Sequence, residues 1–194
     1  MSLELTIQRL LNEIGAKLRI VQLNGRVGRK NVIRSSKVNI PGLELAGYWD
    51  FFSPNSLQIL TNKEIKFIST ISATAMKSIF QHMFSYEIPG VILLKGLEIP
   101  QLIVDLATEM KIPLLQTNVD NTDFLQEINS FLYKEFAPRI NIHGTLIDIY
   151  GVGILLTGRS GIGKSEIALD LIGRGHRLVA DDVVNIEKTS EPSL

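Results

Sequence analysis

The chain is 194 residues long, enough for one large or two small domains, and its 45% hydrophobic and 21% charged composition is typical of soluble globular proteins. Its 20 basic and 20 acidic residues give zero net charge, so no basic excess indicates nucleic acid or an anionic membrane as a partner. Cysteine is absent, which excludes disulfides, thiolate metal sites and cysteine nucleophiles and fits a reducing compartment.

Neither the first residues nor the most apolar stretch indicates export or membrane insertion. Residues 1–4 lack the basic and apolar regions of a signal peptide. The apolar stretch 90–104 is interrupted by Lys95, Glu98 and Pro100, so it does not have the pattern of a membrane-spanning helix. We therefore expect a soluble, cytoplasmic protein.

Helical and strand patterns alternate through residues 1–137, which predicts an N-terminal α/β domain. Apolar residues at helical spacing predict a first helix over 5–15, ended by Gly15. Further helices are expected over 72–83, 100–110 and 123–136, with Pro100 and Asp123 at the starts of the last two. The expected strands cover 18–23, 58–61, 65–71, 91–94 and 113–117. This half has no metal-ligand spacing and no catalytic cluster, so its own role is not indicated.

Two groups of residues in this half have both a structural and a functional interpretation. Residues 26–40 carry five basic side chains, for which a solvated loop is favoured over a contact with phosphate or a polyanion. Trp49 lies in an aromatic cluster over 48–52, which is expected to be core rather than a binding platform. His82 falls on the polar side of its helix and is expected at the surface.

A second domain, residues 138–194, is expected to begin where proline ends the preceding helix at Ala137. Residues 140–149 alternate between apolar and other side chains, which predicts one strand. A turn at Gly151–Gly153 then leads into the apolar run 152–157, expected to be a buried strand.

The run that follows matches the phosphate-binding pattern G-x-x-x-x-G-K-[ST]; it reads Gly158-Arg159-Ser160-Gly161-Ile162-Gly163-Lys164-Ser165. Its glycines let successive backbone N–H groups turn toward phosphate oxygens, and the following helix adds its positive N-terminal end. Lys164 would supply a cation for the β- and γ-phosphates of ATP, and Ser165 a hydroxyl ligand for Mg²⁺.

The context of this run agrees with the motif. A strand precedes it, and residues 166–172 predict a helix with Ile167, Leu171 and Ile172 on one face, closed by Gly173 or Gly175. The alternative, a glycine-rich turn in an unrelated α/β domain, is disfavoured because motif and context agree.

Two adjacent carboxylates, Asp181 and Asp182, end the next apolar strand, only 18 residues after Lys164. A nucleotide enzyme needs a carboxylate near its metal and often a second one to deprotonate the nucleophile. A buried strand beside the loop strand would place them suitably, and in an extended backbone they would point to opposite faces. The alternative is a polar turn after a strand.

About 45 residues of the second domain resemble a known family. The residues that carry the resemblance are Ile142-His143-Gly144, Asp148-Ile149-Tyr150-Gly151, Gly158 to Glu166, and Arg174-Gly175-His176-Arg177-Leu178-Val179-Ala180-Asp181-Asp182. This pattern is similar to bacterial HPr kinase/phosphorylase, whose N-terminal α/β domain also fits residues 1–135 in length and position. The resemblance implies a P-loop catalytic domain with a phosphoenolpyruvate-carboxykinase-like core.

What the family resemblance implies is a bifunctional enzyme of carbon catabolite regulation. Such an enzyme phosphorylates a serine of the phosphocarrier HPr with ATP or pyrophosphate and removes that phosphate by phosphorolysis, releasing pyrophosphate. A homohexamer is implied as well. By the same resemblance His143 and Lys164 match catalytic positions, Ser165 matches a Mg²⁺ ligand and Glu166 a residue beside the metal. One of Asp181 and Asp182 matches the base that deprotonates the serine; Asp182 is favoured, and the sequence does not separate the two.

The resemblance also implies that the catalytic domain is truncated at Leu194. In the family, a further acidic Mg²⁺ ligand, a catalytic arginine and the helices that meet HPr all come later in the chain. Two other functional classes remain open: another small-molecule phosphotransferase or ATPase with a carboxykinase-like core, and a non-catalytic nucleotide-sensing module.

Overall fold

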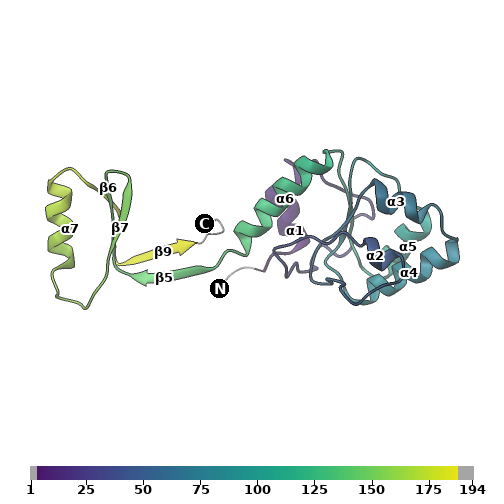
Figure 1. Cartoon of the computed structure of the whole chain (residues 1–194), viewed down its shortest axis with the longest axis horizontal. Helices are drawn as coiled ribbons and strands as arrows, with labels where there is room; N and C mark the ends of the chain where they lie inside the picture. Colours follow the sequence, from purple (N-terminus) through teal and green to yellow (C-terminus); the bar gives the residue numbers. More distant parts are fainter. Residues whose placement is uncertain (1–3, 188–194) are drawn as a thin grey trace. The chain divides into compact units, whose positions relative to one another are not determined.

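In the computed structural model of the protein, the structure is described for residues 4–187. The chain divides into two compact units, Met1–Phe136 and Ala137–Leu194, each of which combines helices with β-strands (Figure 1). The expected α/β class is thus confirmed. No helix in the described part of the chain is long and apolar enough to cross a membrane.

The first unit is built on a four-stranded sheet of order β1-β4-β3-β2. Strands β2 (Gln58–Leu60), β3 (Val91–Leu93) and β4 (Leu114–Gln116) are parallel, and β1 (Val21–Gln22) pairs antiparallel with β4. The three residues of β2 and of β3 are buried, as expected for parallel strands covered on both faces.

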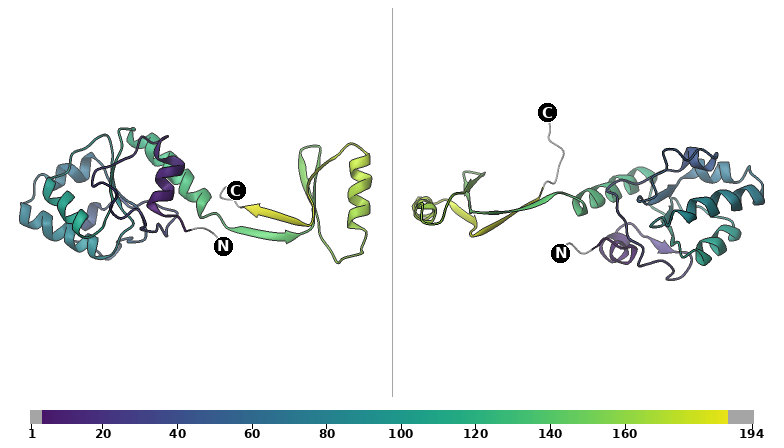
Figure 2. Two further views of the ribbon diagram at one scale, coloured as in Figure 1. Left: turned by 180° about the vertical axis from the view of Figure 1, so that it is seen from behind. Right: turned by 90° about the horizontal axis from the view of Figure 1, so that it is seen from below.

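Helices cover the two faces of this sheet (Figures 1 and 2). One core cluster joins Leu60 and Leu93 to Phe80 and its neighbours, and the other joins Ile59 and Ile92 to helices on the opposite face. Successive strand residues therefore face opposite layers. The helical elements are α1 (Ile7–Leu10), the π-helical turn η1 (Leu11–Gly15), α2 (Gly42–Leu45), α3 (Asn62–Ile68), α4 (Ala73–Ser85), α5 (Gln101–Glu109) and α6 (Asn121–Glu135).

Three expectations for the first unit are wrong in detail. The segment expected as a strand over 65–71 lies in α3 and the turn after it, because Thr61 and Glu64 form a capping box that starts a helix. Helix α6 is capped by Asp120, not Asp123, through a hydrogen bond from the Thr122 N–H to the Asp120 carboxylate. The strand expected over 18–23 contains only Val21 and Gln22.

The aromatic cluster over 48–52 is only partly core. Trp49 and Phe52 pack against the buried cluster, whereas Tyr48 and Phe51 are 47% and 76% exposed. His82 is exposed as expected, with its ring edge-on to Trp49 at a centroid distance of 4.5 Å. Residues 26–40 form an irregular segment with isolated bridges, as the loop interpretation predicts.

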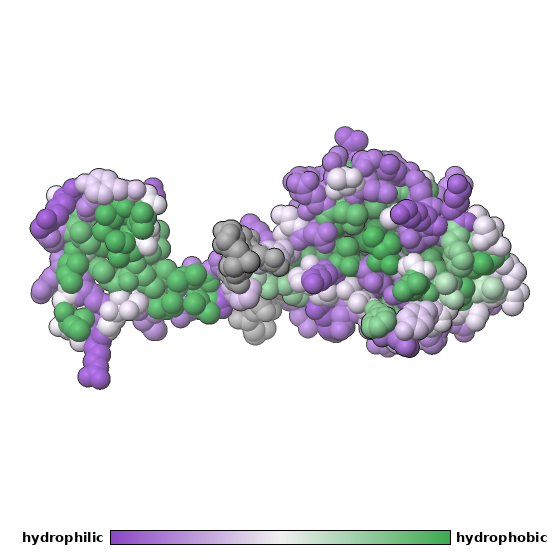
Figure 3. Space-filling view, viewed as in Figure 1, coloured by the Kyte–Doolittle hydropathy of each residue, from purple (hydrophilic) through white to green (hydrophobic). Residues whose placement is uncertain are grey.

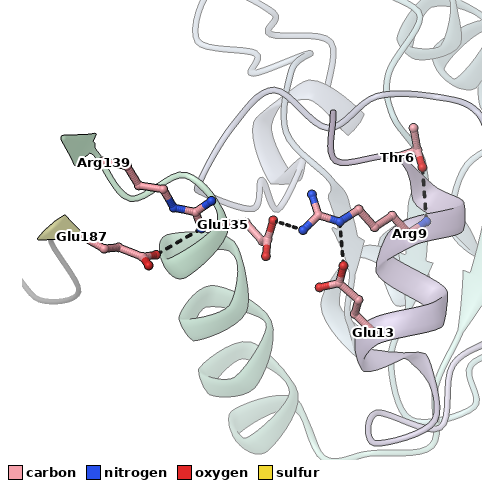
Figure 4. Close-up of polar contacts among 6 residues, drawn as sticks. All are labelled: Thr6, Arg9, Glu13, Glu135, Arg139 and Glu187. Atoms are coloured by element: carbon pink, nitrogen blue, oxygen red, sulfur yellow. Dashed lines mark hydrogen bonds and ion pairs between the residues drawn. The ribbon is translucent and has the colours of Figure 1, made fainter. Parts of the chain in front are cut away.

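Ion pairs join the first helix of this unit to its last (Figure 4). The Arg9 guanidinium donates to Glu13 at 2.6 Å and to Glu135 at 2.7 Å, which links α1 to the C-terminal end of α6. These contacts raise the pKa of Arg9, chiefly through the hydrogen bond to Glu13. Thr6 caps α1 by accepting from the Arg9 N–H.

In the second unit, residues 137–187 form two small sheets and one helix. Strand β5 (Arg139–His143) pairs antiparallel with β9 (Val183–Glu187), and a three-stranded sheet has the order β7-β6-β8. Its strands are β6 (Thr145–Ile149), β7 (Val152–Leu156) and β8 (Arg177–Ala180), and α7 (Lys164–Gly173) connects β7 to β8. An ion pair between Arg139 and Glu187 joins β5 to β9 (Figure 4).

The two sheets share one register as far as Leu146, after which an irregularity between Leu146 and Ile147 shifts it by one residue. Pairing runs from Arg139↔Glu187 to His143↔Val183, and three residues further on it resumes at Leu146↔Ala180. The segment expected as one strand over 140–149 is therefore two consecutive strands, β5 and β6, interrupted at Gly144. Opposite this interruption Asp182 has a φ of 66°, which takes the backbone out of the extended conformation.

Two strands of the second unit, β7 and β8, are not buried by the residues that the structure describes, although Ile147 in β6 is. Val152 and Ile154 in β7 are 63% and 39% exposed, and Val179 in β8 is 50% exposed. Apolar side chains cover a broad part of this unit's surface in Figure 3. The expected buried loop strand is thus a strand, but burial requires covering layers that residues 137–187 do not supply.

Helix α7 begins and ends as expected but presents a different face. Ala168 is its buried residue, whereas Ile167 and Ile172, expected to point inward, are 51% and 37% exposed. Gly175, at a φ of 94°, closes the helix with its N–H bonded to the carbonyl of Ile172.

Candidate active site

The phosphate-binding loop lies between β7 and α7, and the last two residues of the motif, Lys164 and Ser165, form the start of the helix. Gly163 is the N-cap of α7 at a φ of 96°, a left-handed conformation that glycine adopts without steric cost. Its carbonyl accepts the first helical hydrogen bond, from the Ile167 N–H at 3.0 Å. The free N–H groups of the first helical turn thus follow directly on the loop, an arrangement suited to an anion.

Lys164 is the first residue of α7, and its side chain turns back over the loop. The Nζ atom donates to the backbone carbonyls of Gly158 at 3.0 Å and Arg159 at 2.9 Å. Both partners are neutral, so the ammonium charge is not cancelled by either hydrogen bond. The lysine is thereby held beside the loop as a cation for a phosphate group.

The other side of the site is formed by residues next to the break between β5 and β6 and between β8 and β9. His143 ends β5, and its Nδ1 lies 3.2 Å from the carbonyl oxygen of Asp182. A carbonyl oxygen only accepts, so Nδ1 carries the proton in this hydrogen bond and Nε2 is the basic nitrogen of the neutral ring. The Gly144 N–H donates to the same carbonyl, at 3.2 Å.

Asp181 is held by a different set of donors. The Thr145 hydroxyl donates to its Oδ1 at 2.6 Å. This hydrogen bond, followed by one from the Asp182 N–H and by attraction to Lys164, lowers the pKa of the Asp181 carboxyl below its usual range. Asp181 is therefore ionised at neutral pH.

Loop and ribbon line one cavity of about 500 Å³. The cavity brings together most of the residues expected at the site; its lining is His143, Gly144, Thr145, Gly158, Ser160, Gly161, Gly163, Lys164, Ser165, Glu166, Asp181 and Asp182. Two residues of the loop motif, Arg159 and Ile162, are not part of this lining, and Ile162 is 67% exposed.

Two details of the aspartate pair differ from expectation. Strand β8 pairs with β6, so Asp181 and Asp182 follow a strand that is separated from the loop strand by β6. They also do not follow the alternation of a strand, because the left-handed Asp182 bends the chain between β8 and β9, with the Val183 N–H bonded to the Asp181 carbonyl at 2.9 Å.

Sequence reasoning did not single out Thr145 as a site residue. The signal for it was present in the spacing, since a ribbon paired at His143↔Val183 places residue 145 opposite residue 181. That register is set by pairing between segments distant in sequence, which a strand pattern alone does not give.

The donors in this cavity fit Mg²⁺ that arrives with a nucleotide. Ser165 and Glu166 offer hard oxygen ligands, and the Glu166 carboxylate lies beside the loop near Gly163. Within residues 4–187 no group of three or more histidine or acidic side chains could hold a metal alone. Mg²⁺ is commonly held by one or two carboxylates plus substrate phosphates, and Glu166 would supply such a carboxylate.

Comparison with known proteins gives matches along the whole chain. The family model described as HPr Serine kinase N terminus matches residues 5–132, and the model described as HPr Serine kinase C-terminal domain matches residues 134–194. HPr kinase/phosphorylase of Geobacter sulfurreducens is 42% identical over 193 residues, which is 100% of this chain and 60% of that protein. The same enzyme of Shouchella clausii is 38% identical over 183 residues, 94% of this chain and 59% of that protein.

The chain thus spans about 60% of the length of these curated relatives. One solved structure, the CBS and DRTGG domains of the regulatory region of Clostridium perfringens pyrophosphatase, is also similar over 63% of this chain and 47% of that chain. Its TM-score is 0.44 and its identity 17%, a likeness too weak to carry an argument.

Proposed function

The chain belongs to the HPr kinase family, and from this we propose that the intact protein is a kinase/phosphorylase acting on a serine of HPr. In the forward reaction the serine hydroxyl would take the γ-phosphoryl group of ATP, or a phosphoryl group of pyrophosphate. In the reverse reaction inorganic phosphate would take the phosphoryl group from phosphoserine, giving pyrophosphate and free serine. The observation that carries this proposal is the cavity in which the phosphate loop faces His143, Asp181 and Asp182.

The loop side of the cavity would bind the phosphoryl donor. Backbone N–H groups of residues 158–165 and the N-terminal end of α7 would accept the phosphate charge, and Lys164 would leave its carbonyl partners for the β- and γ-phosphates. Ser165 and Glu166 would hold Mg²⁺, which supplies positive charge to the phosphate oxygens. This charge is needed whether the leaving group is ADP or serine.

The residues opposite the loop, His143, Asp181 and Asp182, would take up and return the proton of the serine hydroxyl. We assign the base to Asp182, with Asp181 as the alternative, because the lowered pKa of Asp181 makes it a weaker proton acceptor and a more permanent anion. In the forward direction the serine oxygen bonds to phosphorus as its proton passes to the carboxylate and the donor oxygen leaves with its electron pair. In the reverse direction the same carboxyl returns the proton to the departing serine oxygen. His143 lines the same cavity with Nε2 basic, and we assign it a catalytic role beside the transferring group.

The family also supports finer assignments for the intact protein. We propose a carboxykinase-like catalytic core, assembly into a homo-oligomer, a hexamer by resemblance, and a cytoplasmic role in carbon catabolite regulation. The ribbon register and the aspartate pair only 18 residues after Lys164 support a compact core of this kind.

The deciding experiment incubates the intact protein with HPr, Mg²⁺ and ATP and identifies the modified residue by mass spectrometry. Phosphoserine on HPr, lost again with phosphate and accompanied by pyrophosphate, is the expected result. Phosphate release without HPr would show an ATPase instead. Nucleotide binding with neither product would show a sensing module.

A further inference from the structure

Thr145 is a buried polar residue at the centre of the candidate site. Its side chain and backbone together are 3% exposed, and its hydroxyl donates to Asp181. We propose that Thr145 is a positioning residue, which fixes the Asp181 carboxylate relative to the phosphate-binding loop. This inference rests on the proposed function and adds to it a residue that neither touches nor transfers the phosphoryl group.

The position of Thr145 in the sheet gives it contact with both sides of the site. It is the first residue of β6, the central strand, and it pairs with Leu156, the last residue of the loop strand β7. On the other side the ribbon register places it opposite Asp181. Thr145 therefore connects the strand that enters the phosphate loop to the carboxylate that faces that loop.

Asp181 needs such a contact because the backbone around it is irregular. Its neighbour Asp182 has a left-handed φ of 66°, and the regular ladder is interrupted between His143↔Val183 and Leu146↔Ala180. Strand pairing therefore does not fix the direction of the Asp181 side chain. The side-chain hydrogen bond from Thr145 acts together with the weaker one from the Asp182 N–H, and the hydroxyl, held on β6, gives the carboxylate a charge-assisted bond of defined direction.

The close approach of the strands leaves little freedom at this point. A Cβ on Gly144 would lie 2.6 Å from the Leu156 carbonyl oxygen, so β6 begins in tight contact with the end of β7. A displacement of Thr145 would therefore move the loop strand as well. Because small displacements of a reacting group cost large factors in rate, such a rigid connection has a direct catalytic consequence.

The test compares Thr145→Val, which keeps the branched shape and removes the hydroxyl, with Thr145→Ser, which keeps the hydroxyl. In the intact protein we expect Thr145→Val to lower kcat for HPr phosphorylation about tenfold, the effect of losing one orienting bond to a charged group, with KM for ATP within about twofold. Thr145→Ser should stay within about twofold of wild type. Thr70→Val, an exposed threonine of the first unit, is the control and should change neither constant.

A double-mutant cycle separates positioning from a general structural role. If Thr145 acts through Asp181, then Thr145→Val should have no further effect in an Asp181→Ala background. An equal loss in both backgrounds, or a Thr145→Ser variant as impaired as Thr145→Val, would overturn the proposal. So would a kcat of Thr145→Val within twofold of wild type.

A second measurement does not depend on enzyme activity. Hα–Hβ scalar couplings of Asp181, measured by NMR on the intact protein, should show one side-chain rotamer in wild type and rotamer averaging in Thr145→Val. Averaging already present in wild type would refute the positioning role. A fixed rotamer in a protein that does not phosphorylate HPr would instead refute the proposed function and leave the contact itself established.

Discussion

The two units of this chain use similar apolar strands in opposite ways. In the first unit Ile59 and Ile92 are completely buried, because helices cover both faces of the sheet. In the second unit Val152 and Val179 are at least half exposed, although their strands are equally apolar in sequence. The comparison shows that an apolar run predicts a strand, whereas its burial depends on the layers that other segments supply.

The two units also differ in the contacts that hold their side chains, which are apolar packing in the first unit and hydrogen bonds at the candidate site of the second. The first is held by two core clusters with fully buried aromatic side chains such as Phe80 and Phe124. The second carries the candidate site, and there the named contacts are hydrogen bonds across a ribbon, such as Thr145 to Asp181. Stability and chemistry are thus carried by different parts of the chain.

The largest expected difference is in hydrogen exchange of the isolated 194-residue chain. Amides of β2, β3 and β4 should exchange roughly 1000-fold more slowly than those of β6, β7 and β8, because only the first sheet is enclosed by a core. Exchange resolved by NMR or mass spectrometry measures this directly. Equal protection in the two sheets would contradict it, and would mean that another copy or another element completes the second core.

A core substitution should mark the first unit as the source of stability. Phe80→Ala removes a fully buried ring that lies edge-on to Phe84, and it should lower the free energy of unfolding of the first unit by about 3–5 kcal/mol. Urea denaturation followed by circular dichroism measures the change. The control Phe51→Ala removes a ring that is 76% exposed and should cost less than about 0.5 kcal/mol.

In contrast to Phe80→Ala, a substitution at Lys164 should reduce enzyme activity without changing the stability of the first unit. Lys164→Ala in the intact protein should reduce both phosphorylation and phosphorolysis by about 100- to 1000-fold, since the lysine charge serves the phosphates in both directions, an effect on the order of 3–4 kcal/mol. The urea midpoint of the first unit should not move. Lys66→Ala, on an exposed face of α3, is the matched control. Kinase activity of Lys164→Ala within threefold of wild type would remove the lysine from the mechanism.

The next pair of variants separates proton transfer from nucleotide binding. Asp182→Asn should lower turnover in both directions while nucleotide affinity stays within about twofold, and asparagine also tolerates the left-handed φ of this position. Ser165→Ala should instead weaken binding of Mg²⁺ with a non-hydrolysable ATP analogue and be partly rescued by added Mg²⁺. Calorimetric titration beside the phosphorylation assay distinguishes them. If Asp182→Asn loses nucleotide affinity as severely as turnover, Asp182 is a ligand and Asp181 becomes the base.

The smallest expected effect concerns a surface ion pair of the first unit. Lys95 donates to Asp120 at 2.8 Å and lowers the pKa of that carboxyl, with the Thr122 N–H contributing next. A lowered folded-state pKa stabilises the protein at pH values above the unfolded pKa, and this contribution disappears as the pH falls through the folded value. Lys95→Met should raise the pKa of Asp120 in an NMR titration and leave the urea midpoint almost unchanged, because both groups are exposed. A large fall in the urea midpoint would contradict this expectation, and would show that the Lys95–Asp120 ion pair contributes substantially to the free energy of unfolding.

Much of the site was predictable because its chemistry is local in sequence. The loop motif, the helix after it and the aspartate pair lie within 25 residues of each other, and the structure brings them to one cavity. Thr145 was not found, because its partner Asp181 is 36 residues away and their contact depends on strand register. The left-handed Asp182 likewise follows from that pairing and has no local signal.

In the fold, the errors come from competing local signals. Residues 65–71 have the apolar content of a strand, but the capping box at Thr61 and Glu64 selects a helix. The inward face of α7 was misplaced because Ile167 and Ile172 are apolar without being covered by the described residues. The apolar patterns of the sequence therefore predict the alternation of helices and strands. The helix caps and the packing of other segments determine where each element begins and which of its faces is buried.

The continuous register from Arg139↔Glu187 to Leu146↔Ala180 restricts how this segment can change in length. Inserting one residue into either strand between the Arg139–Glu187 ion pair and the interruption would turn every following side chain to the opposite face. His143 and Asp181 would then no longer face the same cavity. A gain or loss of a single residue is therefore compatible with the site only when both strands change together or when a bulge absorbs it, as the register shift between Leu146 and Ile147 does further along the same strand.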